Sequence, residues 1–312
     1  MAPRTLVGAG GVASLVGALA AAGLLLPVSE ALILENAVGV VLFAVATNLL
    51  LGYGGLVSFG QAAFYGSGAY TVTLGSRHWH WSFWVALVLA PLVGAALALP
   101  IGLIALRARK LYFALLTLAF SQLFFVLAQR QFAFTGGDDG SFVKSWATEP
   151  RHAFLLVLAV TTVSCLALWR IVSSPFGLVL QATRENRDRM EALGLNVFVH
   201  QLAAFVISGA FCGLAGALFV VYSQASYPAL LQWTTSGEPV IMAVIGGMYS
   251  FLGPAIGALV YVLGHHYLIQ HTKHWQMILG GVLLAIVLLR PDGLVGLLRA
   301  SVRRPRWAGG RT

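Results

Sequence analysis

Long apolar runs fill most of the chain, and polar residues are confined to the short stretches between them. The runs are continuously apolar rather than alternating, a pattern typical of membrane-spanning helices and not of strands. Each run is close to the ~20 residues that a helix needs to cross a bilayer. They lie at about 5–27, 34–52, 56–75, 82–106, 112–133, 152–171, 199–222, 237–252, 254–270 and 275–290. We therefore expect an all-α polytopic membrane protein with about ten transmembrane helices.

This transmembrane domain is expected to cover residues 1–298, followed by a basic cytoplasmic tail at 299–312. The first run has features of a secretory signal peptide: one arginine, an apolar stretch and then small residues. Its length is nevertheless sufficient to span a bilayer, which favours an uncleaved first transmembrane helix.

The composition supports a membrane location. Only 9% of the residues are charged and 59% are hydrophobic, whereas a soluble domain has about 25% charged residues. The net charge of +9 raises the alternative of nucleic-acid binding. However, only three residues are lysines, and the basic residues lie at the ends of apolar runs, as membrane topology requires. The two cysteines, Cys165 and Cys212, lie inside apolar runs and are expected to be packing residues.

The basic residues also orient the chain. If the N-terminus is cytoplasmic and all the runs span the membrane, 14 of the 19 Lys and Arg residues face the cytoplasm. The positive-inside rule favours this arrangement over the inverted one. Both termini are therefore predicted to be cytoplasmic, and the longest cytoplasmic loop is about 172–198.

This loop contains the most charged stretch of the chain, "RENRDRMEALG" from Arg184 to Gly194. On one helix its charges would form i,i+4 pairs: Arg184 with Asp188, Glu185 with Arg189, and Arg187 with Glu191. A mostly apolar stripe would remain, formed by Asn186, Met190, Leu193 and Val197. Gly194 is expected to cap or kink the helix. The sequence leaves two roles open: a helix on the membrane surface, or a knob that inserts into a groove of a cytoplasmic partner.

Glycines occur in one dense segment and in spaced pairs within the apolar runs. The segment from Asn48 to Tyr70 holds six of them, together with polar residues. It is either tightly packed helix or a broken, re-entrant element that lines a polar path. The pairs Gly209/Gly213 and Gly253/Gly257 have the small-xxx-small spacing of close helix packing. The "TGGDDG" stretch from Thr135 to Gly140 is either a solvated turn or a structured contact surface on the outer side.

Several kinds of chemistry are missing from the sequence. The three lysines follow Arg109, Val143 and Thr272 and never a glycine, so no GxxxxGK[ST] phosphate loop exists, and neither HExxH nor GxSxG occurs. Four histidines cluster at the end of the ninth run, but no carboxylate or thiolate joins them, so no metal site is expected. The runs hold almost no ionisable residues. Glu238 is expected near the outer start of the eighth run, whereas an ion-coupled transporter needs such a group near mid-membrane.

Seven stretches occur in order from about residue 32 to 298: "NLLLGYGGLVSFGQAAFYGSGAY", "RKLYFALLTLAF", "TGGDDG", "SPFGLVLQATRENRDRMEALGLNV", "FVISGAFCGLAGAL", "GPAIGA" and "RPDGLVG". Together they resemble the M-type permease subunit of bacterial branched-chain amino-acid ABC transporters. The resemblance implies an inner-membrane importer subunit for leucine, isoleucine and valine. It implies a second homologous permease, two cytoplasmic ATPase subunits that hold the ATP, and a periplasmic solute-binding protein as partners. No catalysis and no cofactor are expected in this chain, whose other contacts are the small-molecule substrate and membrane lipid.

The resemblance also implies where the working residues lie. Candidate residues for coupling to the ATPase are Arg184, Glu185, Asn186, Met190, Leu193 and Gly194. Candidate residues of the translocation path are Asn48, Ser58, Gln61 and Tyr65. The binding protein is expected to dock on the outer loops 134–151 and 223–237.

Two positions depart from the family's pattern. The family commonly has histidine where this chain has Gln61, and often a third glycine soon after "VIGG", where Met248 and Tyr249 follow. Because relatives of the family also carry urea, short amides or other amino acids, the solute stays open. An ion-coupled secondary transporter is a further alternative, and a membrane-embedded enzyme would need catalytic groups that the sequence does not place convincingly.

Overall fold

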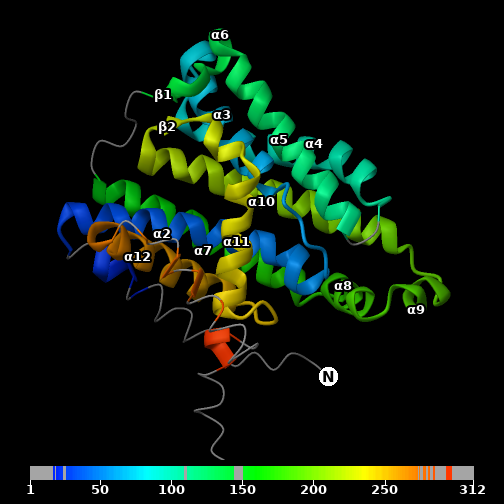
Figure 1. Ribbon diagram of the computed structural model, residues 1–312. Helices are drawn as coiled ribbons and strands as arrows, with labels where there is room; N and C mark the ends of the chain where they lie inside the picture. Colours follow the sequence, from blue (N-terminus) through cyan, green and yellow to red (C-terminus); the bar gives the residue numbers. More distant parts are fainter. Residues whose placement is uncertain are drawn as a thin grey trace, which may run out of the picture.

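The computed structural model describes residues 17, 19–23, 26–108, 111–143, 150–272, 274, 277–278, 280–281, 284 and 293–296. Helices make up nearly all of this part of the chain (Figure 1). In chain order the elements are α2 (Val28–Asn48), η1 (Leu49–Tyr53), α3 (Gln61–Trp79), α4 (Phe83–Ala105), α5 (Leu111–Arg130), α6 (Phe132–Thr135), η2 (Gly137–Asp139), β1 (Ser141–Phe142), α7 (Pro150–Val172), α8 (Pro175–Glu185), α9 (Arg187–Ala192), α10 (Val197–Ser223), β2 (Ala225–Ser226), η3 (Pro228–Leu231), α11 (Trp233–Gly246) and α12 (Gly253–His271).

Five helices of the described residues are long and apolar enough to cross a membrane. They are Val28–Tyr53, Phe83–Ala105, Leu111–Arg130, Arg151–Val172 and Val197–Ser223. The all-helical membrane fold is thus confirmed, but the expected count of about ten spans is not. α3 and α12 are of comparable length and carry more polar residues, and α11 has only 14 residues. Most of the first and tenth predicted spans, 5–27 and 275–290, lies outside the described residues.

α10 forms the centre of the bundle. It packs against α4, α3 and α2, and its side chains at Phe205, Cys212 and Leu218 are at most 1% exposed. Its glycines allow this close approach, because a Cβ at Gly213 would overlap the backbone carbonyl of Ala90 in α4. The small-xxx-small spacing in α10 therefore serves helix packing, as the sequence indicated.

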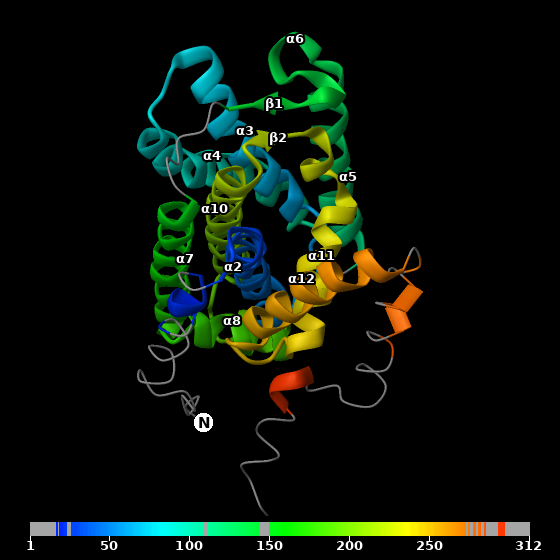
Figure 2. The same ribbon diagram turned by 90° about the vertical axis from the view of Figure 1, so that its left-hand side faces the viewer.

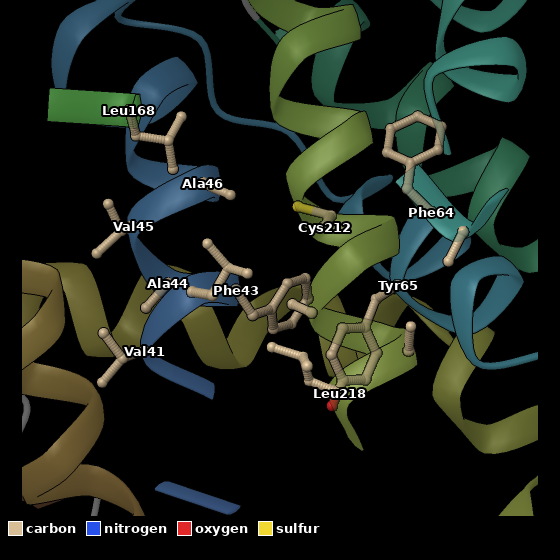
Figure 3. Packing of buried hydrophobic residues seen from close by; sticks show 14 of the residues in the cluster. Val41, Phe43, Ala44, Val45, Ala46, Phe64, Tyr65, Leu168, Cys212 and Leu218 are labelled. Atoms are coloured by element: carbon tan, nitrogen blue, oxygen red, sulfur yellow. The ribbon is translucent and has the colours of Figure 1, made fainter. Parts of the chain in front are cut away.

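The core between α2, α3 and α10 is aromatic at its centre. The rings of Phe43 in α2 and Tyr65 in α3 stack with their centroids 4.4 Å apart. Figure 3 shows the two rings facing each other, with Cys212 and Leu218 of α10 close by. Phe64, next to Tyr65, meets Phe205 of α10 edge to face at 5.5 Å.

The two ends of the bundle are clearly different. At one end β1 and β2 pair antiparallel, with Ser141 opposite Ser226, beside the short helix α6. At the other end lie α8 and α9, which connect α7 to α10. Figures 1 and 2 both place these features at opposite ends of the long helices. We refer to them as the β1–β2 end and the α8–α9 end.

Candidate functional site

A break in the helical path follows α2. The chain passes through the wider turn η1, loses helical structure over 54–60 and resumes as α3 at Gln61. The Gln61 Oε1 atom accepts from Cys212 Sγ at 3.2 Å and from Ser208 Oγ at 3.4 Å. Since Ser208 and Cys212 lie near the middle of α10, α3 begins about halfway along the bundle. The glycine-rich segment is therefore both broken and tightly packed, which the sequence offered as alternatives.

Hydroxyl groups satisfy the backbone around the start of α3. The Ala62 N–H donates to Ser236 Oγ of α11 at 2.8 Å, and the Phe59 N–H donates to Thr117 Oγ1 of α5 at 3.2 Å. The Gly60 N–H donates to Ser58 Oγ at 3.3 Å. Because Ser236 lies in the first turn of α11, two helix starts meet at this level. The positive dipole end of α3 therefore lies in the interior of the bundle.

The four predicted path residues are all buried. Asn48 and Ser58 are 2% exposed, Gln61 is fully buried, and Tyr65 is 5% exposed. Ser58, Gln61 and Tyr65 lie together around the start of α3, whereas Asn48 turns toward the α8–α9 end, where its Nδ2 donates to the Met248 carbonyl at 3.1 Å. Two polar atoms in this set, Asn48 Oδ1 and Gln61 Nε2, have no hydrogen-bond partner within the described chain. The structure thus presents a closed interior with unused polar groups.

The predicted coupling segment is broken as well. α8 ends at Glu185, and Asn186 has an extended backbone with φ −156° and ψ 100°. The Asn186 side chain then caps α9 by accepting from the Arg189 N–H at 2.9 Å. Asparagine is a preferred N-cap because its short side chain reaches the exposed N–H groups of a new helix. The expectation of one continuous helix is therefore wrong.

Two of the three expected ion pairs are lost with that helix. Arg187 and Glu191, both in α9, form the pair at 2.8 Å. The expected pairs of Arg184 with Asp188 and of Glu185 with Arg189 are absent from the described residues, because they would have to span the break. Charge alternation alone does not show where a helix stops.

The expected apolar stripe is divided in the same way. Met190 is 9% exposed and holds α9 to the bundle, Val197 is buried at the start of α10, and Leu193 is 71% exposed. Gly194 adopts φ +82° just after α9, as expected for a helix cap. We call the exposed residues Glu185, Asn186, Leu193 and Gly194 the α8–α9 tip.

Arg184 does not belong to this tip, because its side chain turns inward. It donates from Nη1 to the Gly52 carbonyl of η1, and its guanidinium carbon lies 5.0 Å from the ring centroid of Tyr249. Gly55, with φ +66°, fits against the Arg184 side chain, where a Cβ would overlap it. Arg184 thereby joins α8 to the break after α2. Tyr249, which the sequence marked only as a departure from a family pattern, is its cation–π partner.

The outer "TGGDDG" stretch is structured. Thr135 Oγ1 donates to the Gln131 carbonyl at 2.8 Å, and Gln129 Nε2 donates to Asp138 Oδ1 at 3.0 Å. The pairing of β1 with β2 then brings the loop after α5 against the loop after α10. Parts of the two predicted docking loops therefore form one surface at the β1–β2 end, although 144–149 lie outside the described residues.

A pocket of 420 Å³ opens near the same end, between α3, α4 and α5. Its lining is mainly apolar and includes Trp79, Trp81 and Phe134. It lies away from Gln61 and Asn48, so it does not coincide with the predicted path.

Sequence reasoning missed the buried carboxylate of Glu35, and it identified Glu238 without indicating its neighbours. Glu35 of α2 is 1% exposed, and neither of its carboxylate oxygens has a partner within the described residues. Glu238 was expected near the outer start of a span, but it lies two residues after Ser236, at the level where α3 begins. A single carboxylate inside an apolar run was the available signal in both cases.

Comparisons with known proteins agree with this architecture. Residues 31–288 match the family described as the branched-chain amino acid transport system permease component. The high-affinity branched-chain amino acid transport system permease protein LivM of Salmonella typhimurium is 28% identical over 84% of this chain and 69% of its own. Escherichia coli LivM is 27% identical over the same shares of the two chains.

A more distant relative is named for a different solute. The nucleoside ABC transporter permease protein NupC of Lactococcus lactis is 30% identical over 32% of each chain. No solved structure gives a significant match. The match to the family description covers most of the chain, including α2 to α12. This protein therefore belongs to the family of branched-chain amino acid transport system permease components.

Proposed function

We propose that this chain is a membrane-spanning subunit of an ATP-driven importer for leucine, isoleucine and valine in the bacterial inner membrane. In this proposal it pairs with a second homologous permease, and two cytoplasmic ATPase subunits hold and hydrolyse the ATP. A periplasmic binding protein delivers the solute to the β1–β2 end. The family assignment and the LivM relatives support this function. The chain itself is a transport subunit and not an enzyme.

One observation carries the mechanism: the link between the α8–α9 tip and the broken segment after α2. The tip exposes an apolar side chain, Leu193, among polar ones, which suits insertion into a groove of a soluble partner. Behind the tip, Arg184 joins α8 to the Gly52 carbonyl. Movement of a docked ATPase would therefore reach the break directly.

The break is the proposed gate. The Phe59 and Ala62 N–H groups donate to hydroxyls of neighbouring helices, and the Gly60 N–H donates to Ser58 Oγ within the segment. Such bonds can be exchanged when the helices shift, which is how discontinuous helices serve alternating access in other transporters. Opening would expose Ser58, Gln61 and Tyr65 to the solute, with Asn48 toward the cytoplasmic side. Both termini and the loop at about 172–198 are cytoplasmic in this proposal.

The decisive experiment is reconstitution of the complete complex in proteoliposomes. Leucine-loaded binding protein should stimulate ATP hydrolysis and drive leucine uptake, and isoleucine and valine should compete. Uptake without ATPase subunits, or no stimulation by any branched-chain amino acid, would contradict the proposal.

The same proteoliposomes distinguish two alternatives, a different solute and an ion-coupled secondary transporter. Permeases named for nucleosides and for autoinducer 2 are among the distant relatives, and urea, short amides or other amino acids are further possible solutes. An ion-coupled secondary transporter is favoured by one observation, the carboxylates Glu35 and Glu238 at membrane depth. It predicts uptake by this chain alone under an imposed ion gradient.

A further inference from the structure

The pocket between α3, α4 and α5 has no part in the proposed import mechanism, yet it is large enough for a ligand. It measures 420 Å³, within the ~300–1,000 Å³ usual for small-molecule sites. Both α3 and α5 pack on η3, which holds them apart at this place. Leu231 of η3 lies where a Cβ at Gly66 of α3 would overlap it, and its carbonyl accepts from Ser121 Oγ of α5 at 2.7 Å. The space beside Leu231, between the two helices, is the pocket.

The walls of this pocket offer almost no free polar groups. Ser67 Oγ and Thr71 Oγ1 donate to the Phe64 and Ser67 carbonyls of their own helix, each at 2.8 Å. The Tyr70 hydroxyl has no hydrogen-bond partner within the described residues, but it is covered by protein. Apolar side chains from all three helices also line the pocket, among them Leu74, Val93, Leu97, Phe124 and Leu127. A polar occupant would lose its hydrogen bonds to water without replacement, so the pocket suits an alkyl chain.

Aromatic rings form the rim of the pocket near the β1–β2 end. Trp79 and Trp81 stack with their centroids 5.1 Å apart, and Phe134 of α6 meets Trp79 edge to face at 6.2 Å. All three side chains line the pocket. Tryptophan is enriched where a membrane protein crosses from hydrocarbon to water, because its ring is apolar with one polar group. The rim therefore fits the level of the lipid headgroups, and the rest of the pocket lies at the depth of their chains.

The pocket is continuous with the outer apolar surface of the bundle. Leu127 of α5 lines the pocket and is also 47% exposed. On α4, Val93 lines the pocket, and its neighbour Leu92 is 59% exposed. Both helices are long and apolar enough to cross a membrane, so this surface suits contact with hydrocarbon. The chain of a neighbouring lipid can therefore enter the pocket without passing through water.

Arg77 supplies a cation near the rim. It follows the pocket-lining residues Tyr70 and Leu74 at i+7 and i+3, on the same side of α3. Arg77 is exposed, and in the part of the chain that the structure describes it forms no ion pair or hydrogen bond. Asp138, at the same end of the bundle, accepts instead from Gln129 Nε2 at 3.0 Å. The guanidinium of Arg77 is thus available for a phosphate at headgroup level.

We propose that this pocket binds one acyl chain of a phospholipid from the leaflet at the β1–β2 end, with the lipid phosphate on Arg77. The proposal depends on neither the solute nor ATP-driven import. Walls that face an empty pocket lack contacts on one side, and an alkyl chain restores them. The bound chain joins α5 to α3 and α4, so the lipid stabilises the folded protein.

The first test maps lipid contacts on the full chain in nanodiscs. The probe is a phosphatidylglycerol with a diazirine on one acyl chain, and mass spectrometry locates the adducts after photolysis. Adducts on the half-buried pocket residues Leu97 and Phe124 should outnumber those on the exposed Val88 and Leu92 several-fold. Equal or weaker labelling of the pocket residues is the result for ordinary surrounding lipid and would overturn the inference. This comparison uses the wild type alone, so it does not depend on the folding of any variant.

The second test fills the pocket. Val93→Trp places a large ring inside it, and Val88→Trp, the same change on the exposed face of α4, is the matched control. Both variants are first checked by size-exclusion chromatography. Val93→Trp should reduce adducts in the pocket at least about tenfold, and Val88→Trp should leave them unchanged. Phosphatidylglycerol added to delipidated protein should raise the melting temperature of the wild type and of Val88→Trp, but not of Val93→Trp. An equal rise in all three would contradict binding in the pocket.

The third test concerns the phosphate. A diacylglycerol with the same diazirine has the acyl chains but no phosphate, so it should label the pocket of the wild type several-fold less than the phospholipid does. Arg77→Gln should abolish this preference, whereas Arg151→Gln, at an exposed arginine of α7, should retain it. Equal labelling of the wild-type pocket by the two probes would overturn the assignment of the phosphate to Arg77.

Discussion

At the scale of single residues, Arg184 shows how a side chain can look like a surface charge and act inside the molecule. Its neighbours Glu185 and Asn186 are exposed, but its guanidinium reaches the Gly52 carbonyl and the face of Tyr249. The end of η1 leaves carbonyls without helical partners, and a cation there satisfies both the hydrogen bond and the negative end of the helix dipole. Arg184 thus holds the break after α2 in position against α8.

We expect the loss of the Arg184 contacts to uncouple leucine import from ATP hydrolysis without preventing assembly of the complex. Arg184→Met should keep most of the side-chain volume and still bind the ATPase, but import less leucine per ATP hydrolysed, by roughly tenfold for a loss of about 1.4 kcal/mol. Arg184→Lys should recover part of the coupling, since it keeps the charge without the planar guanidinium. Uptake and phosphate release, measured on the same proteoliposomes, give the ratio. An unchanged ratio in Arg184→Met would refute the link.

Tyr249 tests the other side of this contact. Tyr249→Phe retains the ring and should leave the import-to-hydrolysis ratio nearly unchanged, whereas Tyr249→Leu should lower it several-fold. Phenylalanine and leucine differ little in size, and Tyr249 is 62% exposed, so neither substitution should affect folding strongly. Equal ratios in the two variants would show that the ring face contributes nothing.

At the scale of elements, the α8–α9 tip predicts where the ATPase binds. Leu193 is 71% exposed and has no role in the core of this chain, so Leu193→Asp should disrupt an apolar contact with the partner. Glu185→Arg reverses a charge on the same exposed surface. Both variants should insert into the membrane normally. The amount of ATPase that co-purifies with each of them should fall at least about tenfold. The exposed Asp188→Asn is the matched control, and full ATPase recovery with Leu193→Asp would exclude the tip as the docking site.

The sequence predicted the long helices well, for a simple physical reason. A helix that faces lipid must be apolar over its whole length, so 82–106 and 199–222 agree with α4 and α10 to within about two residues, the usual spread of helix ends. α3 was less predictable, because it begins inside the bundle, where hydroxyl groups of other helices accept its hydrogen bonds in place of water. The start of α3 depends on Ser236, which lies 174 residues away from Ala62 in the chain.

The candidate site was predictable only in part for the same reason. Ser58, Gln61 and Tyr65 were identified from their polar character within a glycine-rich segment, and they do lie together. The inward turn of Arg184 depends on a long-range contact, because its guanidinium reaches Gly52, which lies 132 residues away in the chain.

At the scale of the whole molecule, the outer faces of the long helices are strongly apolar. In α4, Trp84, Val88 and Leu92 follow one another at i, i+4 and i+8 and are 63%, 64% and 59% exposed. A stripe of this kind would be unfavourable in water and suits contact with membrane lipid. The β1–β2 end and the α8–α9 end lie at opposite ends of the bundle that these helices form.

In the proposed orientation, the two ends are accessible to reagents from opposite sides of the membrane. Phe142 in β1 and Leu193 after α9 are 69% and 71% exposed, so a cysteine at either place should react equally well in detergent. The native thiols, buried Cys212 and half-buried Cys165, are first replaced by alanine. In intact cells whose outer membrane admits it, a membrane-impermeant maleimide should label Phe142→Cys and not Leu193→Cys. Labelling of Leu193→Cys should appear only after the inner membrane is opened. Because nothing but the orientation of the bundle distinguishes the two sites, the reverse pattern would invert the topology and move the α8–α9 tip out of reach of any cytoplasmic ATPase.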